Sequence, residues 1–197
     1  MDARRRRVAF AVLLFVLVTG AATAQDRGFT PVTDAMLQDP DPADWPMWRR
    51  TLDGWGYSPL DQIDRDNVGE LRMVWSRGMT EGAQQGTPLV YDGVLYMPNP
   101  RDVIQAIDAV TGDLLWEYRR DNPDDVAEYV GNLTTNRNIA IYGRHIIDTS
   151  VDNKHLYHNS TLALDGDTGE IRWYYQHLNG RAESTGVPGR AEFTING

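Results

Sequence analysis

A tryptophan-containing unit occurs twice in this chain, and it restricts the fold more than any other feature of the sequence. The copies span residues 105–118 and 162–175 and share the pattern A-x-D-x-x-T-G-x-x-x-W. Each copy predicts a strand, a tight turn and a second strand, because the glycine after the threonine can adopt a positive φ at no steric cost. Two unrelated hairpins with similar turn chemistry are the alternative, but a shared pattern that includes tryptophan favours a repeat architecture of β units. We therefore expect Trp116 and Trp173 to occupy equivalent buried positions.

Hairpin signals outside the repeat extend the β pattern along the chain. Asp92-Gly93 separates two apolar runs, which is the strongest short-range signal for a hairpin, and Gly143-Arg144 separates two more. Residues 71–75 carry the apolar alternation of a half-buried strand. Strands at spacings of about 8–12 residues predict an all-β sandwich, barrel or propeller, and the tryptophan repeat favours the propeller.

The N-terminal residues have the organisation of a secretory signal peptide. Four arginines at positions 4–7 precede an apolar run over residues 8–18, and residues 22–24 (ATA) form a small-residue cleavage motif. The apolar run is short for a membrane span, and an uncleaved anchor is the alternative. We expect residues 1–24 to be removed, which gives a periplasmic chain without a transmembrane span. Residues 25–44, rich in proline and aspartate, are expected to form an extended lead-in.

Composition removes several classes of function and site. The formal net charge is −9, which argues against nucleic acid as a partner, because binding to phosphates requires a basic face. The chain has no cysteine, so disulfides and thiolate metal sites are excluded. Residues 45–59 concentrate tryptophan among glycine and proline, and predict an aromatic patch over a sheet edge. Asn196-Gly197 has the form of a hairpin turn without its second strand, so we expect a truncated protein.

The segment from residue 45 to residue 178 resembles the N-terminal part of the quinoprotein alcohol dehydrogenases. Members of that family are periplasmic propellers of eight blades that bind pyrroloquinoline quinone (PQQ) and Ca²⁺ or a lanthanide ion. The resemblance implies that residues 45–197 form an incomplete PQQ-type β-propeller domain, the first blades of an eight-bladed propeller with tryptophan-docking units. Besides the two tryptophan units, it rests on residues 55–60 (WGYSPL), 67–71 (NVGEL), 87–96 (TPLVYDGVLY) and 136–143 (NRNIAIYG).

The same resemblance places three cofactor-binding residues. Gln85 falls where the family has an acidic or amide residue before the T-P-L-V strand, and Arg137 falls in an N-R motif whose arginine binds the quinone oxygens. A polar loop residue and a surface arginine are the alternatives for these two positions. Thr185, in the pair Ser184-Thr185, stands about where the family places Ser and Thr beside the cofactor, but its surroundings are glycine-rich, and a plain loop fits them equally well. The family's catalytic aspartate and metal ligands lie downstream of residue 197, so the resemblance assigns neither a catalytic nor a metal-binding residue here.

The activity implied by the resemblance is the oxidation of a primary alcohol or related polyol to an aldehyde or ketone. Electrons would pass to PQQ and then to a periplasmic acceptor such as a c-type cytochrome. The chain corresponds to the first third or so of a family member, so we expect a fragment that is inactive alone. Many members carry adjacent cysteines over the quinone, and this chain has none, which leaves the subclass open. The alternative function is a cofactor-free propeller that acts as a scaffold, although that class carries a lipobox cysteine after its signal peptide.

Overall fold

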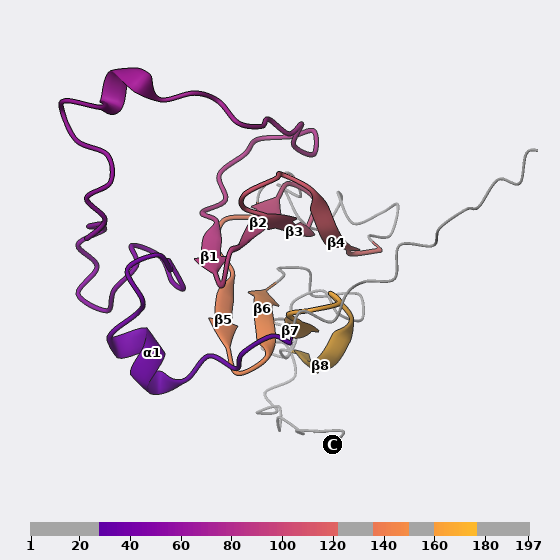
Figure 1. Ribbon diagram of the computed structural model, residues 1–197. Helices are drawn as coiled ribbons and strands as arrows, with labels where there is room; N and C mark the ends of the chain where they lie inside the picture. The colour runs from indigo at the N-terminus through magenta and orange to yellow at the C-terminus, as the bar shows by residue number, and fades with distance from the viewer. Residues whose placement is uncertain (1–27, 122–135, 150–159, 177–197) are drawn as a thin grey trace, which may run out of the picture.

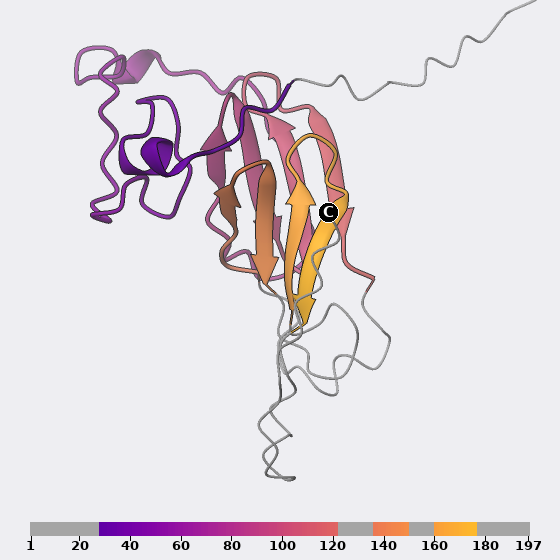
Figure 2. The same cartoon turned by 90° about the horizontal axis from the view of Figure 1, so that it is seen from below.

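Two four-stranded antiparallel sheets, each with its strands in sequence order, make up the regular part of the chain (Figure 1). The computed structural model describes residues 28–121, 136–149 and 160–176. The two sheets are stacked face to face, and β1 to β4 follow one another across the first sheet in the same direction as β5 to β8 across the second (Figure 2). The first sheet contains β1 (Leu89–Tyr91), β2 (Val94–Asn99), β3 (Val103–Asp108) and β4 (Leu114–Arg119), and the second contains β5 (Ala140–Tyr142), β6 (His145–Thr149), β7 (Ser160–Asp165) and β8 (Ile171–Gln176).

The first hairpin of each sheet is closed by the residues that the sequence predicted. Tyr91 pairs with Val94 across a two-residue turn in which Asp92 and Gly93 both have positive φ, 49° and 72°. This conformation matches the twist of the flanking strands and favours an Asp-Gly pair. In the second sheet, Gly143 takes the positive φ at the turn between β5 and β6. Both predicted hairpins are therefore confirmed.

The repeated tryptophan unit forms the same hairpin in both sheets. Asp108 accepts hydrogen bonds from the backbone N–H groups of Val110 and Thr111 at 2.9 Å each, and Asp165 does so from the corresponding two residues at 3.0 and 3.1 Å. In both hairpins the strand register shifts after the alanine that faces the tryptophan. The equivalence of Trp116 and Trp173 within their sheets is thus confirmed.

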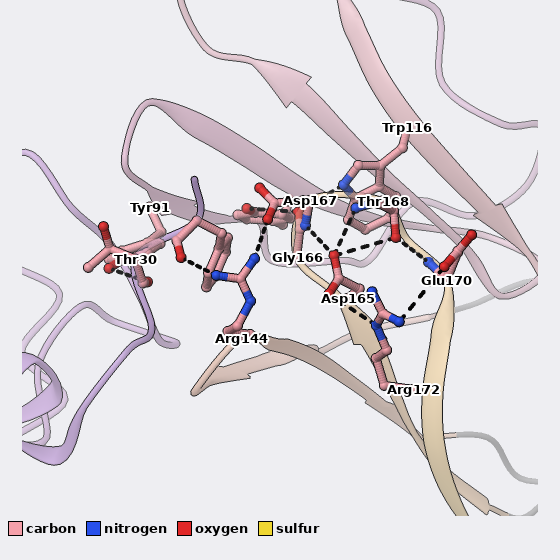
Figure 3. Close-up of polar contacts among 12 residues, drawn as sticks. Thr30, Tyr91, Trp116, Arg144, Asp165, Gly166, Asp167, Thr168, Glu170 and Arg172 are labelled. Carbon is pink, nitrogen blue, oxygen red and sulfur yellow. Dashed lines mark hydrogen bonds and ion pairs between the residues drawn. The ribbon is translucent and has the colours of Figure 1, made fainter. Parts of the chain in front are cut away.

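Trp116 joins the first sheet to the second. Its indole Nε1–H donates to the carbonyl oxygen of Gly166 at 2.9 Å (Figure 3), and its ring covers Gly169, where a Cβ atom would lie 2.6 Å from Cε3. Only glycine, which has no side chain and takes a φ of +73° here, allows so close an approach. Trp116 is 8% exposed, whereas Trp173 is only half-buried, so the prediction of equal burial was wrong for Trp173. The two tryptophans differ in burial because Trp116 packs against the next sheet along the chain. The described residues include no further sheet against which Trp173 could pack.

Trp75 makes the equivalent contact with the first sheet, at the turn between β3 and β4. Its Nε1–H donates to Ala109 O at 3.1 Å, and its ring lies on Gly112, where a Cβ would be 2.7 Å from Cδ2. The segment that carries it, residues 71–75, is nevertheless not a strand, and Met73 and Val74 are each 83% exposed. The prediction of a half-buried strand was therefore wrong. Apolar alternation fits a strand, but a strand also needs a partner, and none of the described strands pairs with this segment.

The N-terminal part of the described chain packs across both sheets. The backbone of Val32 pairs with that of Gly143, and Phe29 lies against Tyr91 of β1 with ring centroids 5.5 Å apart. Arg144 donates to the carbonyl oxygen of Phe29 at 2.6 Å and forms an ion pair with Asp167 (Figure 3). The core of the two sheets therefore includes this lead-in segment.

The lead-in also contains a short helix, α1 (Asp34–Gln38), where an extended segment was predicted. Thr33 caps it, since its hydroxyl accepts a hydrogen bond from the N–H of Met36 at 3.3 Å. A helix of five residues shows no periodicity in the sequence, so the cap was its only signal. A single 3₁₀ turn, η1 (Val68–Glu70), is the other helical element among the described residues.

The prediction of an aromatic patch packed over a sheet edge was wrong, although the first residue of the segment does pair with such an edge through its backbone. The backbone of Trp45 pairs with that of Val90 on the edge strand β1, with hydrogen bonds of 2.7 and 3.0 Å. Trp48 and Trp55 are instead 58% and 79% exposed. The predicted signal peptide, residues 1–24, lies outside the described residues, and no helix in the described part of the chain is long and apolar enough to cross a bilayer.

Candidate functional site

Gln85 and Arg137, two of the three residues predicted to bind a cofactor, contact each other. Gln85 precedes β1 and Arg137 precedes β5, so each side chain leaves the segment that enters the first strand of its sheet. Arg137 Nε–H donates to Gln85 Oε1 at 2.9 Å, although the residues are 52 positions apart. Both residues are exposed at this junction. The third residue, Thr185, lies outside the described residues, and its role stays a prediction.

The backbone around the pair is held as closely as the side chains. Thr87 N–H donates to the carbonyl oxygen of Arg137 at 2.9 Å, which joins the segments that lead into β1 and β5. Gly86, in the segment that leads into β1, packs closely against β2, and a Cβ atom there would lie 2.4 Å from Pro98 O and 3.2 Å from Asn136 O. A side chain at position 86 would therefore clash with the backbone of β2 and crowd that of Asn136, so close approach of the backbones requires glycine here.

The chemistry of the pair suits an anionic or quinonoid ligand. The guanidinium of Arg137 is planar and permanently charged, and it has further N–H donors on Nη1 and Nη2 besides the one that Gln85 receives. Gln85 orients the guanidinium through its amide oxygen but adds no opposing charge. The pair thus presents a fixed positive charge with donors in a plane, which matches carboxylate and quinone oxygens. PQQ, a tricarboxylated quinone, fits this donor set.

A buried polar cluster is linked to the exposed pair through Asn136, the residue that precedes Arg137. Arg120, just after β4, forms an ion pair with Asp148 of β6 at 3.0 Å, and the two side chains are 2% and 0% exposed. The Asn136 amide donates to the other carboxylate oxygen of Asp148 at 3.2 Å. Burial raises the pKa of the Asp148 carboxyl to about 6, although Arg120 favours its charged form. Asp102, 3.4 Å from Arg120 Nε, raises that pKa further through its own negative charge.

Arg120 and Asp148 are the members of this junction that sequence reasoning missed. They are 28 positions apart, in segments that resemble ordinary strand ends. The N-R dipeptide did mark Asn136, but only as part of the motif that contains Arg137. As to metals, the described residues contain no group of three or more His, Asp or Glu side chains placed to hold an ion.

Comparison with known proteins adds to this geometry. Residues 45–147 match the family model described as the glucose/ethanol/alcohol dehydrogenase β-propeller domain. The dehydrogenase subunit of alcohol dehydrogenase (quinone) from Gluconacetobacter polyoxogenes is 32% identical over 196 residues, which is 98% of this chain and 25% of that protein. The chain spans about a quarter of the length of the curated relatives it matches.

Solved structures show the same arrangement of sheets. The quinohemoprotein alcohol dehydrogenase ADHIIG from Pseudomonas putida HK5 superimposes with a TM-score of 0.65 at 30% identity, over 77% of this chain and 21% of that one. A europium-containing methanol dehydrogenase gives a TM-score of 0.62 at 25% identity, over 74% of this chain and 25% of that one. The two described sheets therefore correspond to part of a propeller, and they do not close a ring by themselves.

Proposed function

Because the chain belongs to the glucose/ethanol/alcohol dehydrogenase β-propeller family, we propose that it supplies the first blades of a periplasmic PQQ-dependent alcohol dehydrogenase. Its substrate would be a primary alcohol or related polyol, and its product an aldehyde or ketone. Residues 45–197 would form part of the propeller domain, after export directed by residues 1–24.

The observation that carries this proposal is the hydrogen bond between Gln85 and Arg137. Two residues that the family resemblance assigns to a quinone site meet at the junction of two sheets, with 2.9 Å between Arg137 Nε and Gln85 Oε1. This contact supports a shared role for the two residues, because it brings together side chains from two different sheets.

The proposed role of each residue follows from its chemistry. Arg137 would donate through its guanidinium to carboxylate or carbonyl oxygens of the cofactor and fix its orientation. Gln85 would hold the guanidinium in plane without cancelling its charge. When bound, PQQ would supply the redox chemistry by accepting two electrons from the alcohol.

The remaining parts of the site are proposed to come from a longer polypeptide. Residues beyond 197 would hold Ca²⁺ or a lanthanide ion and provide the carboxylate that takes the hydroxyl proton of the substrate. A c-type cytochrome in the periplasm would receive the electrons. Since each blade buries one face against the next, two sheets alone would leave apolar surface and strand edges exposed.

The test compares residues 25–197 with an extended polypeptide, in which the same segment is followed by the coding sequence that continues it in the genome. Each is incubated with PQQ and Ca²⁺, and dye reduction is followed with short-chain alcohols. We expect turnover from the extended polypeptide only. Turnover by residues 25–197 alone would show that the chemistry does not need residues further along, and absence of PQQ-dependent turnover from the extended polypeptide would reject the assigned function.

A further inference from the structure

We propose that Asp148 and Arg120 are positioning residues for the Gln85–Arg137 pair and that they act through Asn136. That the pair so positioned serves to bind a cofactor rests on the function proposed above. The arrangement itself rests on contacts between described residues and is tested without a cofactor.

The first step of the argument is that Arg137 is tethered on two sides. From the first sheet, Thr87 N–H donates to its carbonyl oxygen at 2.9 Å. From the second sheet, the preceding residue Asn136 is fixed by its amide, which donates to Asp148 Oδ1 at 3.2 Å. Asn136 is 6% exposed, so water does not readily replace that bond. The direction in which the Arg137 side chain leaves the backbone is thus set by both tethers together.

The second step is that each carboxylate oxygen of Asp148 accepts a hydrogen bond from a different partner. Oδ2 accepts from Arg120 Nη2 at 3.0 Å, while Oδ1 accepts from Asn136. An ionised carboxylate accepts at both oxygens, whereas an amide at the same position would present a donor to one of these two partners. Replacement of Asp148 by Asn would therefore release Asn136 or leave Arg120 without its acceptor.

The third step concerns what a buried ion pair contributes. Two charges with side chains 2% and 0% exposed lose most of their hydration, and apolar residues of similar volume commonly give equal or greater stability. A fixed arrangement of neighbouring polar groups is what such a pair supplies instead. Here the ordered neighbour is Asn136, next to the exposed guanidinium. The charged groups that face Asp148 are Arg120, after β4, and Asp102, before β3.

The experiment measures hydrogen exchange in the whole chain without a cofactor, at two hydrogens that report on the position of Arg137. These are the N–H of Thr87, by mass spectrometry, and the Nε–H of Arg137, by nitrogen-15 NMR. The variants are Asn136→Ala, which removes the tether and leaves the ion pair, and Asp148→Asn, which keeps the shape and removes the charge. The control is Trp116→Phe, which removes a different bond between the sheets, that to Gly166.

We expect both hydrogens to exchange about fivefold or more faster in Asn136→Ala and Asp148→Asn, since a lost hydrogen bond of about 1 kcal/mol corresponds to that factor. In Trp116→Phe they should exchange at wild-type rates. Unchanged rates in Asn136→Ala overturn the proposal, and so does an equal acceleration in Trp116→Phe, which would mean general loosening of the sheets. If Asp148→Asn does not fold, Asn136→Ala decides. Failure of the extended polypeptide to bind PQQ would reject the proposed function and leave this result unaffected.

Discussion

The contact between Trp116 and Gly169 predicts how much stability depends on docking one sheet against the next. Replacing Gly169 by alanine has two consequences. The residue has a φ of +73°, which costs an L-residue about 1 kcal/mol or more, and its new Cβ would lie 2.6 Å from the indole ring. Overpacking of this kind costs about 1–3 kcal/mol. We therefore expect Gly169→Ala to lower the free energy of unfolding by about 2–4 kcal/mol.

A matched control separates the two contributions. Gly93 has nearly the same φ, +72°, and a Cβ added there meets nothing within 4 Å. The effect of Gly93→Ala on the free energy of unfolding therefore comes from backbone strain and from the altered entropy of the unfolded chain, without a steric clash. We expect it to cost about 1 kcal/mol, so the difference between the two variants measures the docking contact.

The assay is urea unfolding at neutral pH, followed by circular dichroism. The reasoning also predicts that Gly169→Ala costs less in a Trp116→Leu background, where the smaller side chain leaves room for the Cβ. The double-mutant cycle should then give a coupling of about 1 kcal/mol or more. Equal losses for Gly93→Ala and Gly169→Ala, or no coupling to Trp116, would refute the view that the indole is docked against this glycine.

Three further predictions concern a second docked glycine, the buried carboxyl of Asp148 and the N-terminus. Gly112→Ala should also cost about 2–4 kcal/mol, because its Cβ would lie 2.7 Å from the Trp75 ring; urea unfolding checks this, and a loss no larger than that of a clash-free glycine would contradict it. The pKa of Asp148 is raised from 3.8 to about 6, so between these pH values the folded state binds more protons than the unfolded state. The protonated carboxyl therefore contributes to stability below pH 3.8, and this contribution is lost as pH rises through about 6. The unfolding free energy of the wild type relative to Asp148→Asn should thus fall across that window in urea titrations, and parallel curves would contradict this. Secreted protein should begin at Gln25 on N-terminal sequencing, whereas a start at Met1 would refute cleavage.

Local turn chemistry explains why much of the fold could be predicted from the sequence. Asp108 and Asp165 bind the backbone of their own turns, and glycine follows where φ must be positive, so each hairpin is encoded within a dozen or so residues. Residues 71–75 show the limit of the same reasoning. Their apolar alternation depends on one segment alone, whereas a strand requires a second segment that pairs with its backbone. The pattern contains no information on whether such a partner is present.

The candidate site was predictable only in part, because its members come from distant segments. Gln85 and Arg137 were identified through family resemblance, and nothing in their spacing of 52 residues indicated that they would touch. Asp148 and Arg120 had no sequence signal, since a charged residue within or just after a strand is usually solvated. Only the packing of the second sheet on the first buries them together.

The most direct test of the proposed site is the affinity of the extended polypeptide for PQQ, measured by fluorescence quenching, with Arg137→Lys compared with Arg119→Lys. Lysine keeps the charge but lacks the planar donor fork, so the first variant should bind PQQ about tenfold or more weakly, as expected for loss of a charge-assisted hydrogen bond. Arg119, whose side chain is 59% exposed beside Glu117, serves as the control and should leave the affinity unchanged. Equal PQQ affinities for Arg137→Lys and the wild type would contradict the assignment of this junction to the quinone.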